Sequence, residues 1–540
     1  MAVRTTVGVN APSSGGGDEV EVLIVGGGPV GLTARALLER WGVRALLIEK
    51  HRGLSPFPRS RLINVRSMEI FRQLGLAAQI TAAAFAPEYG RIRFRDTLLD
   101  RDFATAAMIG INAPVPESPV IGVVTSQDRL EPVLLAAASA PVRFGVECTD
   151  VVEEADGVVA LLVDHPRGRE IRVRARYVLA ADGADSTLRR RLGIDSTGPG
   201  ALGDFTSVLF DADLDRWCAG QPAGVYFTSR GAFGPLYPEG GWVWFFPTPE
   251  GADRTDWPRF VSQALDGGSG AGVDVRASVS RVQHWVMNAF VAESFRRGRV
   301  LLAGDAAHAV PPTGGLGMNT GIADVHNLCW KLAGVLRGWA EPSLLGTYEA
   351  ERLPVADRTL SQAVENTRIM LQVQGRRQDE HRTGDGVPPE RIELPWSEQY
   401  FAQLGLVLGV TYRSGAVLDD GGLPSTASGS GTDYVPSALP GRRMPHLQLA
   451  DGRSTLDAFG EWFTLLTPDP LPWQRQGTEP WPTRIENLPP GHADLCGITP
   501  TGALLVRPDG HVAARWARCP PGDSPVRHAL TALTGGMPRT

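Results

Sequence analysis

A glycine-rich segment near the start of the chain has the spacing of a phosphate-binding turn. The apolar run Val20–Val25 predicts a buried strand, and three glycines follow it in the pattern GxGxxG. Gly26 permits the tight turn, Gly28 lets main chain approach a pyrophosphate, and Gly31 lets a helix pack closely on the strand. Glu49 ends the next apolar run, where a carboxylate can accept a ribose hydroxyl bond. The segment therefore predicts dinucleotide binding.

Two dipeptides further along the chain also follow predicted strands. Asp182-Gly183 comes after the apolar run Tyr177–Ala181, and Gly304-Asp305 comes after Val300–Leu302. One such dipeptide alone is weak evidence for a functional site. Three motifs in this order, each anchored to a strand, form a specific pattern.

The residues that follow Asp305 predict an electrostatic site made of main chain. The segment Pro311–Gly315 removes backbone donors and bulk, and Gly315–Asn319 opens a helix. A helix N-terminus presents unpaired N–H groups and about half a positive charge, which stabilises negative charge on a ligand. We expect His308 in the same loop to be a packing residue bonded to the backbone rather than a base.

The three motifs together resemble the class A flavoprotein monooxygenases, the single-component FAD-dependent aromatic hydroxylases. The resemblance covers roughly residues 20–418. Within the family, the sequence is most similar to the branch whose enzymes modify aromatic polyketides during antibiotic biosynthesis in actinobacteria. The resemblance implies that Asp305 bonds the ribityl chain of FAD and that Glu49 bonds the adenosine ribose. The implied cofactor-binding residues are Gly26, Gly28, Pro29, Val30, Gly31, Glu49, Lys50, Arg59, Gln127, Asp182, Gly304, Asp305, Pro312, Gly315, Gly317, Met318 and Asn319.

The resemblance also implies a reaction. NADPH or NADH, bound transiently, reduces the flavin, and O2 adds to it as a C4a-(hydro)peroxide that hydroxylates a polycyclic aromatic polyketide. The flavin-activating loop would comprise Pro312, Gly315, Gly317 and Met318, and no side chain is identified as an acid or base. Baeyer–Villiger and ring-cleaving or rearranging oxygenations by the same flavin remain open alternatives, because the shape of the substrate site decides between them.

These residues need a scaffold, and the predicted elements supply one. The fold class is α/β, with a Rossmann-type FAD-binding domain, an antiparallel-sheet substrate domain and, by resemblance, a C-terminal thioredoxin-like domain. The hairpin around Asp509-Gly510 belongs to this last domain, which has no redox cysteine pair. The predicted boundaries are 1–18 for a disordered lead-in, 19–90, 121–195 and 295–372 for the FAD domain, 91–120 and 196–294 for the substrate domain, 373–418 for a helical connector, 419–446 for a linker and 447–540 for the thioredoxin-like domain.

An aromatic stripe in the substrate domain has two interpretations. Trp242, Trp244 and Phe246 fall on one face of a predicted strand and are candidates for lining the substrate site, although such a stripe is more often sheet core. The same stretch nearly reproduces the GWxWxIP pattern of flavin-dependent halogenases. Those enzymes use a lysine, and the only two here, Lys50 and Lys331, occupy other predicted positions. Halogenation is therefore a minor alternative, as is a flavin-binding protein without catalysis.

Composition excludes several other classes of function. The net charge of −6 predicts no nucleic-acid or membrane partner, and the arginines at alternate positions of Arg172–Arg176 are expected on the solvated face of a strand. No apolar stretch is long enough for a bilayer, and no signal-peptide pattern is present. Five scattered cysteines show no metal-binding spacing and are typical of free thiols in the cytoplasm. We expect a cytoplasmic monomer or homodimer.

Overall fold

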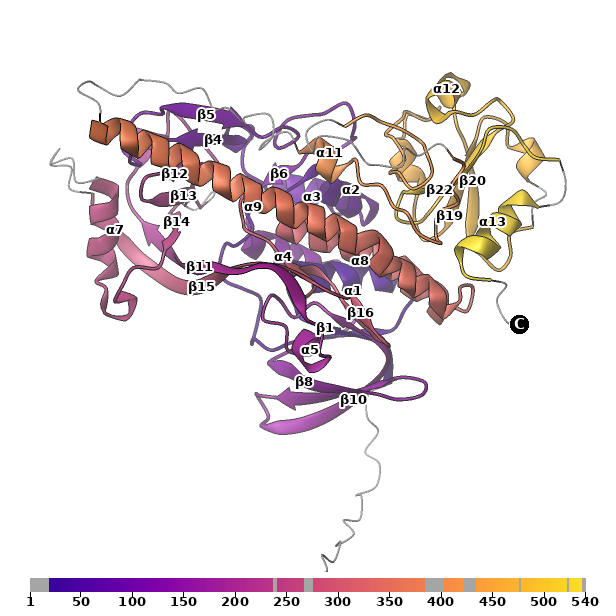
Figure 1. Cartoon of the computed structure of the whole chain (residues 1–540), viewed down its shortest axis with the longest axis horizontal. Helices are drawn as coiled ribbons and strands as arrows, with labels where there is room; N and C mark the ends of the chain where they lie inside the picture. Colours follow the sequence, from indigo (N-terminus) through magenta and orange to yellow (C-terminus); the bar gives the residue numbers. More distant parts are fainter. Residues whose placement is uncertain are drawn as a thin grey trace, which may run out of the picture.

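The computed structural model describes residues 19–236, 240–266, 275–383, 403–421, 434–474, 477–521 and 524–536. The predicted lead-in, 1–18, lies outside them. The chain folds into two large sheets and a smaller C-terminal sheet, and Figure 1 shows the C-terminal unit at one end of the molecule. No helix in the described part of the chain has the length and apolar character that a bilayer crossing requires.

The first large sheet has the parallel core that its apolar runs predict. Its order is β16-β17-β10-β1-β2-β7, and the pairs from β17 through β7 are parallel, whereas β8 and β9 form an antiparallel extension on β10. Every residue of β1 from Glu21 onward is buried, as expected for a strand covered on both faces. This unit's elements are β1 Glu19–Val25, α1 Pro29–Arg40, β2 Ala45–Glu49, β3 Leu62–Ile63, α2 Val65–Gln73, α3 Ala77–Ala82, β6 Val123–Val124, α4 Gln127–Ala136, β7 Val142–Phe144, β8 Val146–Glu153, β9 Val158–Asp164, β10 Arg169–Ala180, α5 Thr187–Arg191, β16 Arg296–Arg297, β17 Val300–Leu302 and α8 Gly317–Leu336.

The second large sheet is mainly antiparallel, as predicted for the substrate domain. Its order is β18-β15-β11-β14-β13-β12-β4-β5, in which only the β12–β4 pair is parallel. Helix α7 packs on one face through Val261 and Leu265. The elements are β4 Arg91–Phe94, β5 Ala104–Ala107, β11 Ser196–Asp211, α6 Asp215–Cys218, β12 Val225–Thr228, β13 Gly231–Pro235, β14 Trp242–Pro247, α7 Trp257–Asp266, β15 Ser278–Ala292 and β18 His308–Ala309.

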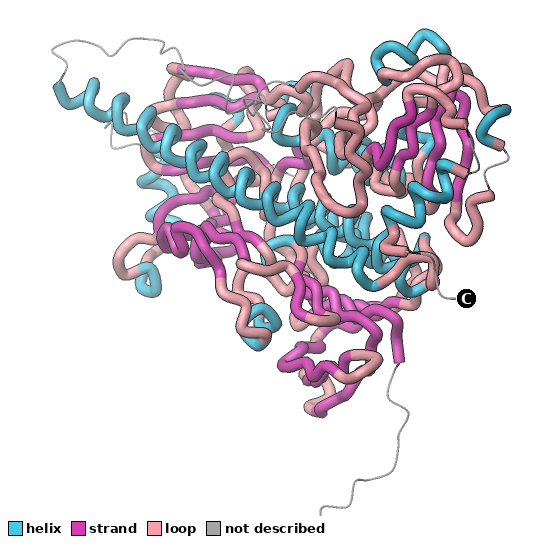
Figure 2. The backbone as a smooth tube through the Cα atoms, turned by 45° about the vertical axis from the view of Figure 1, so that its right-hand side comes forward, coloured by secondary structure: helices cyan, strands magenta, loops and turns pink. Residues whose placement is uncertain are grey.

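One long helix, α9 (Gly346–Thr383), crosses the molecule and ties these units together. It contacts β15 of the second sheet and α8 of the first unit, and Figures 1 and 2 show it running along both units. The position of α8 is therefore set by neighbours from several parts of the chain.

The C-terminal unit contains a four-stranded sheet of order β20-β19-β21-β22, with one parallel and two antiparallel pairs. The predicted hairpin around Asp509-Gly510 is confirmed as the turn between β21 and β22. Ala438 and Met444, which were assigned to a linker, pack in the core of this unit. Its elements are β19 Phe463–Thr467, β20 Thr483–Asn487, α12 Ala493–Cys496, β21 Ala503–Val506, β22 Val512–Trp516 and α13 Pro525–Leu533. The short helix α11 (Leu404–Val407) precedes this unit and packs against Val65 and Val115 of the earlier part of the chain.

The arginines of β10 lie as their alternation predicts. Arg172 and Arg176 are exposed and Arg174 is half-buried, while the intervening Val173 and Ala175 are buried. Arg174 pairs with Glu154 and Asp156 on neighbouring surface segments. The run is the solvated face of a strand, where its charges contact other parts of the same chain.

Candidate functional site

A cavity of about 2010 Å³ lies where the two large sheets meet the start of α8. Its walls include the glycine-rich turn after β1, the loop after β17 and the inner face of the second sheet. Ligand cavities are typically about 300–1,000 Å³, so this one has room for a dinucleotide and a second molecule.

The three motif glycines have the separate roles that their spacing predicts. Gly26 has a φ of +111°, and a Cβ there would lie 2.1 Å from the carbonyl oxygen of Ala181 on the neighbouring strand. A Cβ on Gly31 would lie 2.0 Å from the carbonyl oxygen of Gly26. Beside Gly28, by contrast, no atom lies within 4 Å of an added Cβ. Gly26 and Gly31 thus maintain the turn and packing, whereas Gly28 borders open space in the cavity.

The start of α1 presents backbone N–H groups that can bind an anion. Gly28 is its N-cap, makes no side-chain cap bond and is followed by Pro29 at the first helical position. The first helical bond runs from the Leu32 N–H to the Gly28 carbonyl at 3.0 Å, so the preceding amides face the turn. Glu49 accepts hydrogen bonds from the amides of Gly27 (2.7 Å) and His51 (2.8 Å), which hold its carboxylate at the cavity edge.

The loop after β17 brings Asp305 into the cavity wall. Gly304 has a φ of +59° and packs against Val30, where a Cβ would be 2.9 Å from a methyl group. The Asp305 carboxylate is open to the cavity and makes no hydrogen bond to any residue that the structure describes. Desolvation by the cavity walls raises the pKa of its carboxyl, while His308 and Arg59 oppose that rise. Such a carboxylate suits a hydroxyl donor on a ligand.

The N-terminus of α8 is open, as the loop predicts. Leu316 occupies the N-cap without a side-chain cap bond, and the first helical bond joins the Thr320 N–H to its carbonyl at 2.9 Å. The amides of Gly317 and Met318 therefore have no helical acceptor, and both residues line the cavity. The positive end of a 20-residue helix dipole lies at the cavity wall.

The side chain of Asn319 binds protein instead of the cavity. Its amide oxygen accepts from the Asn64 N–H at 2.9 Å, and its amide nitrogen donates to the carbonyls of Leu62 (2.9 Å) and Gly315 (2.7 Å). Asn319 is buried and does not border the cavity. This residue holds the start of α8 against β3, which differs from the direct cofactor contact that the sequence predicts.

Other predicted cofactor residues divide into two groups. Lys50, Arg59 and Pro312 line the cavity, as do Gln127 and Asp182, although the last two also bind protein. Gln127 donates to Glu131 at 2.6 Å, and Asp182 accepts from Ser186 Oγ at 2.6 Å and from the Leu188 amide at 3.1 Å at the start of α5. Gly31 and Gly304 do not border the cavity and act through packing.

His308 differs from its prediction. Its Nε2 lies 2.6 Å from Asp324 Oδ2, and both side chains are fully buried. The partner is a carboxylate on α8, not the backbone. The sequence held no sign of this pairing, because the two residues belong to different elements.

The aromatic stripe on β14 lies mainly in the core. Trp244 and Phe246 pack against aromatic residues of α7, whereas Trp242 packs beside Tyr226 of β12. The three side chains are 8% (Trp242), 2% (Trp244) and 4% (Phe246) exposed. Trp244 and Phe246 also border the cavity, but Trp242 does not, which corrects its assignment as a lining residue. The large rings fill the space between sheet and helix, where they remove the most apolar surface from water.

The other face of β14 is the one that meets the FAD-binding unit. Phe245 pairs with Ser207 of β11 and Ala232 of β13, and all three line the cavity. Phe57, from the first unit, packs against Phe245 and its neighbour Val243. Phe245 was missed as a cavity residue. Period-two alternation reveals the two faces of the strand but not which one meets the cavity.

The residues present fit an FAD. Open space beside Gly28 lies next to the amides of a helix N-terminus, and Glu49 is held beside the same turn by the Gly27 amide. Among the described residues, none donates a hydrogen bond to the carboxylate of Asp305. The second helix N-terminus, that of α8, would supply positive potential to a flavin ring bound at the cavity wall.

Comparisons with known proteins agree with this geometry. Residues 19–363 match the family described as FAD binding domain, and residues 437–536 match the aromatic-ring hydroxylase C-terminal family. The chain is 34% identical to tetracenomycin B2 monooxygenase-dioxygenase of Streptomyces olivaceus, covering 92% of this chain and 95% of that protein. It is 35% identical to a putative polyketide hydroxylase of Streptomyces halstedii, over 97% and 99% of the two chains.

A solved structure resembles the whole molecule. The crystal structure of the flavin-dependent monooxygenase PieE in complex with FAD and substrate superposes with a TM-score of 0.86 at 30% identity. The match covers 96% of this chain and 99% of that one. Two helix N-termini open onto one cavity that can hold a dinucleotide, and the matches extend along the chain. The protein therefore belongs to the FAD-dependent aromatic-ring hydroxylases and is a flavoprotein monooxygenase.

Proposed function

We propose that the enzyme uses FAD, NAD(P)H and O2 to hydroxylate a polycyclic aromatic polyketide. The observation that carries this proposal is the open N-terminus of α8 in a wall of a cavity that is large enough for a flavin and a multi-ring substrate. The naming of a relative as a putative polyketide hydroxylase supports the substrate class.

The proposed cofactor residues act through main chain and two carboxylates. The amides before Leu32 and the space beside Gly28 would hold the pyrophosphate, Glu49 the adenosine ribose, and Asp305 the ribityl chain. When bound, FAD supplies hydride acceptance and activation of O2. The amides of Gly317 and Met318 would stabilise negative charge on a flavin ring held beside them, because they already point into the cavity wall without a helical acceptor.

The second sheet supplies the proposed substrate wall. Ile92, Phe227 and Phe245 line the cavity from three strands of the same sheet, and Met287 adds an apolar side chain from β15. This surface orients a flat substrate and excludes water. No side chain is assigned as acid or base.

We also propose the predicted domain assignments, with the C-terminal unit as thioredoxin-like and with Ala438 and Met444 belonging to that unit instead of the linker. Its strand order, one parallel pair beside two antiparallel pairs, and its flanking helices α12 and α13 support that assignment. Cys496 is buried and Cys519 half-buried, and neither forms a disulfide, so a role in assembly or support fits better than thiol redox chemistry.

The test is to measure flavin content, then NADPH and NADH oxidation with and without polycyclic phenols, under 18O2. We expect a yellow protein, faster NAD(P)H oxidation with substrate, and a product heavier by one labelled oxygen. Ring-opened or lactone products would support the Baeyer–Villiger or ring-cleaving alternative instead. Turnover of single-ring phenols alone would contradict the substrate class, and a halide-dependent product would contradict hydroxylation.

A further inference from the structure

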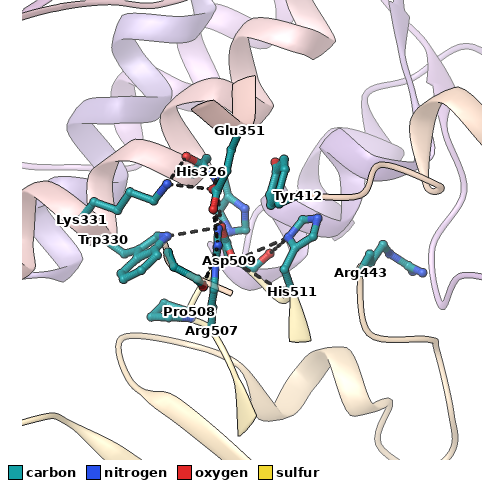
Figure 3. A network of polar contacts seen from close by, with 12 residues as sticks. His326, Trp330, Lys331, Glu351, Tyr412, Arg443, Arg507, Pro508, Asp509 and His511 are labelled. Atoms are coloured by element: carbon teal, nitrogen blue, oxygen red, sulfur yellow. Dashed lines mark hydrogen bonds and ion pairs between the residues drawn. The ribbon is translucent and has the colours of Figure 1, made fainter. Parts of the chain in front are cut away.

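The tip of the C-terminal hairpin, Arg507–His511, inserts between α8 and α9 (Figure 3). The Arg507 guanidinium donates to both carboxylate oxygens of Glu351 on α9, at 2.6 and 2.8 Å, and also pairs with Asp509. These three side chains are fully buried. A bidentate pair of this kind fixes orientation as well as distance.

Helix α8 joins the same cluster along one of its faces. Lys331 Nζ lies 2.8 Å from Glu351 Oε2, and the Asn327 amide donates to Glu351 (2.6 Å) and Asp509 (3.2 Å). Trp330 Nε1 donates to Asp509 at 3.3 Å. Burial lowers the pKa of Lys331 to about 8, with the nearby Glu351 opposing, and Arg507 and Lys331 hold the pKa of Glu351 well below its usual range against the effect of burial.

The charges of this cluster balance. Two cations, Lys331 and Arg507, meet two carboxylates, Glu351 and Asp509, away from solvent. Removing these charges from water costs free energy, so a buried charged cluster often stabilises a fold no more than well-packed apolar residues of the same volume would. The charged cluster instead fixes the relative positions of three segments, namely α8, α9 and the C-terminal hairpin.

The face of α8 that binds the hairpin continues to the cofactor loop. Asp324 lies three residues before Asn327, and its Oδ2 accepts the Gly304 amide at 3.1 Å and contacts His308 Nε2. Its Oδ1 accepts from Arg352 Nε at 2.8 Å, and Arg352 is the neighbour of Glu351 on α9. Arg352 also donates to the Tyr412 hydroxyl at 3.1 Å, and the Tyr412 ring lies 4.1 Å from the ring of His511.

We propose that the C-terminal unit is a positioning element of the cofactor site. The clamp, defined as Lys331, Glu351, Arg507 and Asp509, fixes α8 along its axis, so that Asp324 holds the Gly304–Asp305 loop and the open amides of Gly317 and Met318 stay at the cavity wall. This inference rests on the proposed function for the identity of the bound cofactor. The positioning of the loop itself is a property of the chain without cofactor.

A second buried ion pair at the boundary of the C-terminal unit provides a matched control for the clamp. Arg443, in the C-terminal unit, makes a bidentate pair with Glu69 on α2, and both side chains are as buried as those of the clamp. The side chains of that pair make no hydrogen bond or ion pair with α8 or α9 in the described part of the chain. Arg66 joins Glu69 (3.0 Å) to the Asp509 carbonyl of the hairpin (2.7 Å), so the control removes a buried pair beside the hairpin and keeps the contacts of Glu351 and Lys331. If burial between units were the only role of the clamp, removing either pair would have the same consequences.

The experiment uses the full chain and two charge-balanced double variants. Lys331→Met with Glu351→Gln removes one cation and one carboxylate of the clamp and leaves the Arg507–Asp509 pair. Glu69→Gln with Arg443→Met is the control. The measurements are thermal stability, the dissociation constant of FAD from flavin fluorescence, the flavin midpoint potential, and amide hydrogen exchange of residues 304–320 in the apo-protein. Arg507→Lys, which keeps the charge but loses the planar fork, is a milder clamp variant if the double variant does not fold.

We expect the clamp variant to weaken FAD binding by at least about tenfold, equivalent to about 1.4 kcal/mol. It should also lower the midpoint potential and speed exchange in residues 304–320, while the control variant loses stability without these changes. Arg507→Lys should show the same changes in smaller size. Equal effects of clamp and control on FAD binding and exchange, or unchanged exchange in both clamp variants, would overturn the proposal. If the unaltered chain bound no FAD, the proposed function would fail, whereas exchange in the apo-protein would still decide the positioning.

Discussion

Asp305 combines an unpaired carboxylate with a desolvated position at the cavity wall. In the apo-protein this charge lies open to the cavity, where desolvation by the walls raises the pKa of the carboxyl and no described residue donates a hydrogen bond to it. With FAD bound, the same carboxylate would accept a hydrogen bond from the ribityl chain. Asp305 is therefore expected to strengthen FAD binding and to lower the stability of the apo-protein.

We predict that Asp305→Ala separates these two effects. FAD binding should weaken by roughly 1.5–3 kcal/mol, the range for a hydrogen bond to a charged group, or roughly 10–150-fold in dissociation constant. The apo-protein should keep or gain thermal stability. Flavin fluorescence titration and thermal melting measure the two quantities, and unchanged FAD affinity would contradict the assignment of Asp305.

The motif glycines allow a similar test at single residues. Gly28→Ala places a methyl group in open cavity space, so the melting temperature should hardly change while FAD binding weakens by roughly 1–3 kcal/mol through steric displacement. Gly26→Ala is the control, because its Cβ would meet the Ala181 carbonyl in a left-handed conformation and should destabilise the fold itself. Equal loss of stability in the two variants would show that Gly28 is structural.

At the scale of elements, Trp242 and Phe245 on the two faces of β14 have different surroundings. Trp242→Ala should cost about 3–5 kcal/mol of unfolding free energy, because Trp242 fills the core of the second sheet beside Tyr226. Phe245→Ala should leave the fold largely intact and raise the KM for an aromatic substrate severalfold, by loss of cavity wall. Chemical denaturation and steady-state kinetics distinguish the two. A rise in KM for Trp242→Ala with unchanged stability would reverse the assignment of the faces.

At the scale of the whole molecule, two buried histidines at the boundary of the C-terminal unit predict acid sensitivity. Burial lowers the pKa of His511 to about 4 and that of His326 to about 3, the latter helped by Arg66, whereas both titrate near 6.5 when unfolded. The unfolded chain then binds more protons below pH 6.5, so stability falls as the pH falls toward those values.

Each histidine should remove about 1.4 kcal/mol of unfolding free energy per pH unit in that window. We expect thermal stability to fall below pH 6.5, with a shallower fall in His511→Asn. The matched control is His165→Gln, since His165 is a surface residue with half its side chain exposed, and it should leave the slope unchanged. An identical slope in the unaltered protein and in His511→Asn would refute this origin.

The local motifs could be predicted from the sequence because their requirements are local. A tight turn after a strand needs a residue with positive φ at Gly26, and helix packing needs the absence of a side chain at Gly31; a few consecutive residues decide both. The open start of α8 follows in the same way from the glycines and prolines before it. The hairpin at Asp509-Gly510 was also predictable, since its turn depends on neighbouring residues.

Contacts between distant segments were decided only by the tertiary structure. The alternation in β14 revealed two faces, but the packing of α7 and Phe57 determined that Phe245 meets the first unit. Arg507 and Glu351 lie 156 residues apart, and no local pattern pairs them. Period and spacing specify backbone conformation and the faces of an element, whereas the partner of each face depends on how all the elements pack to bury their apolar surfaces together.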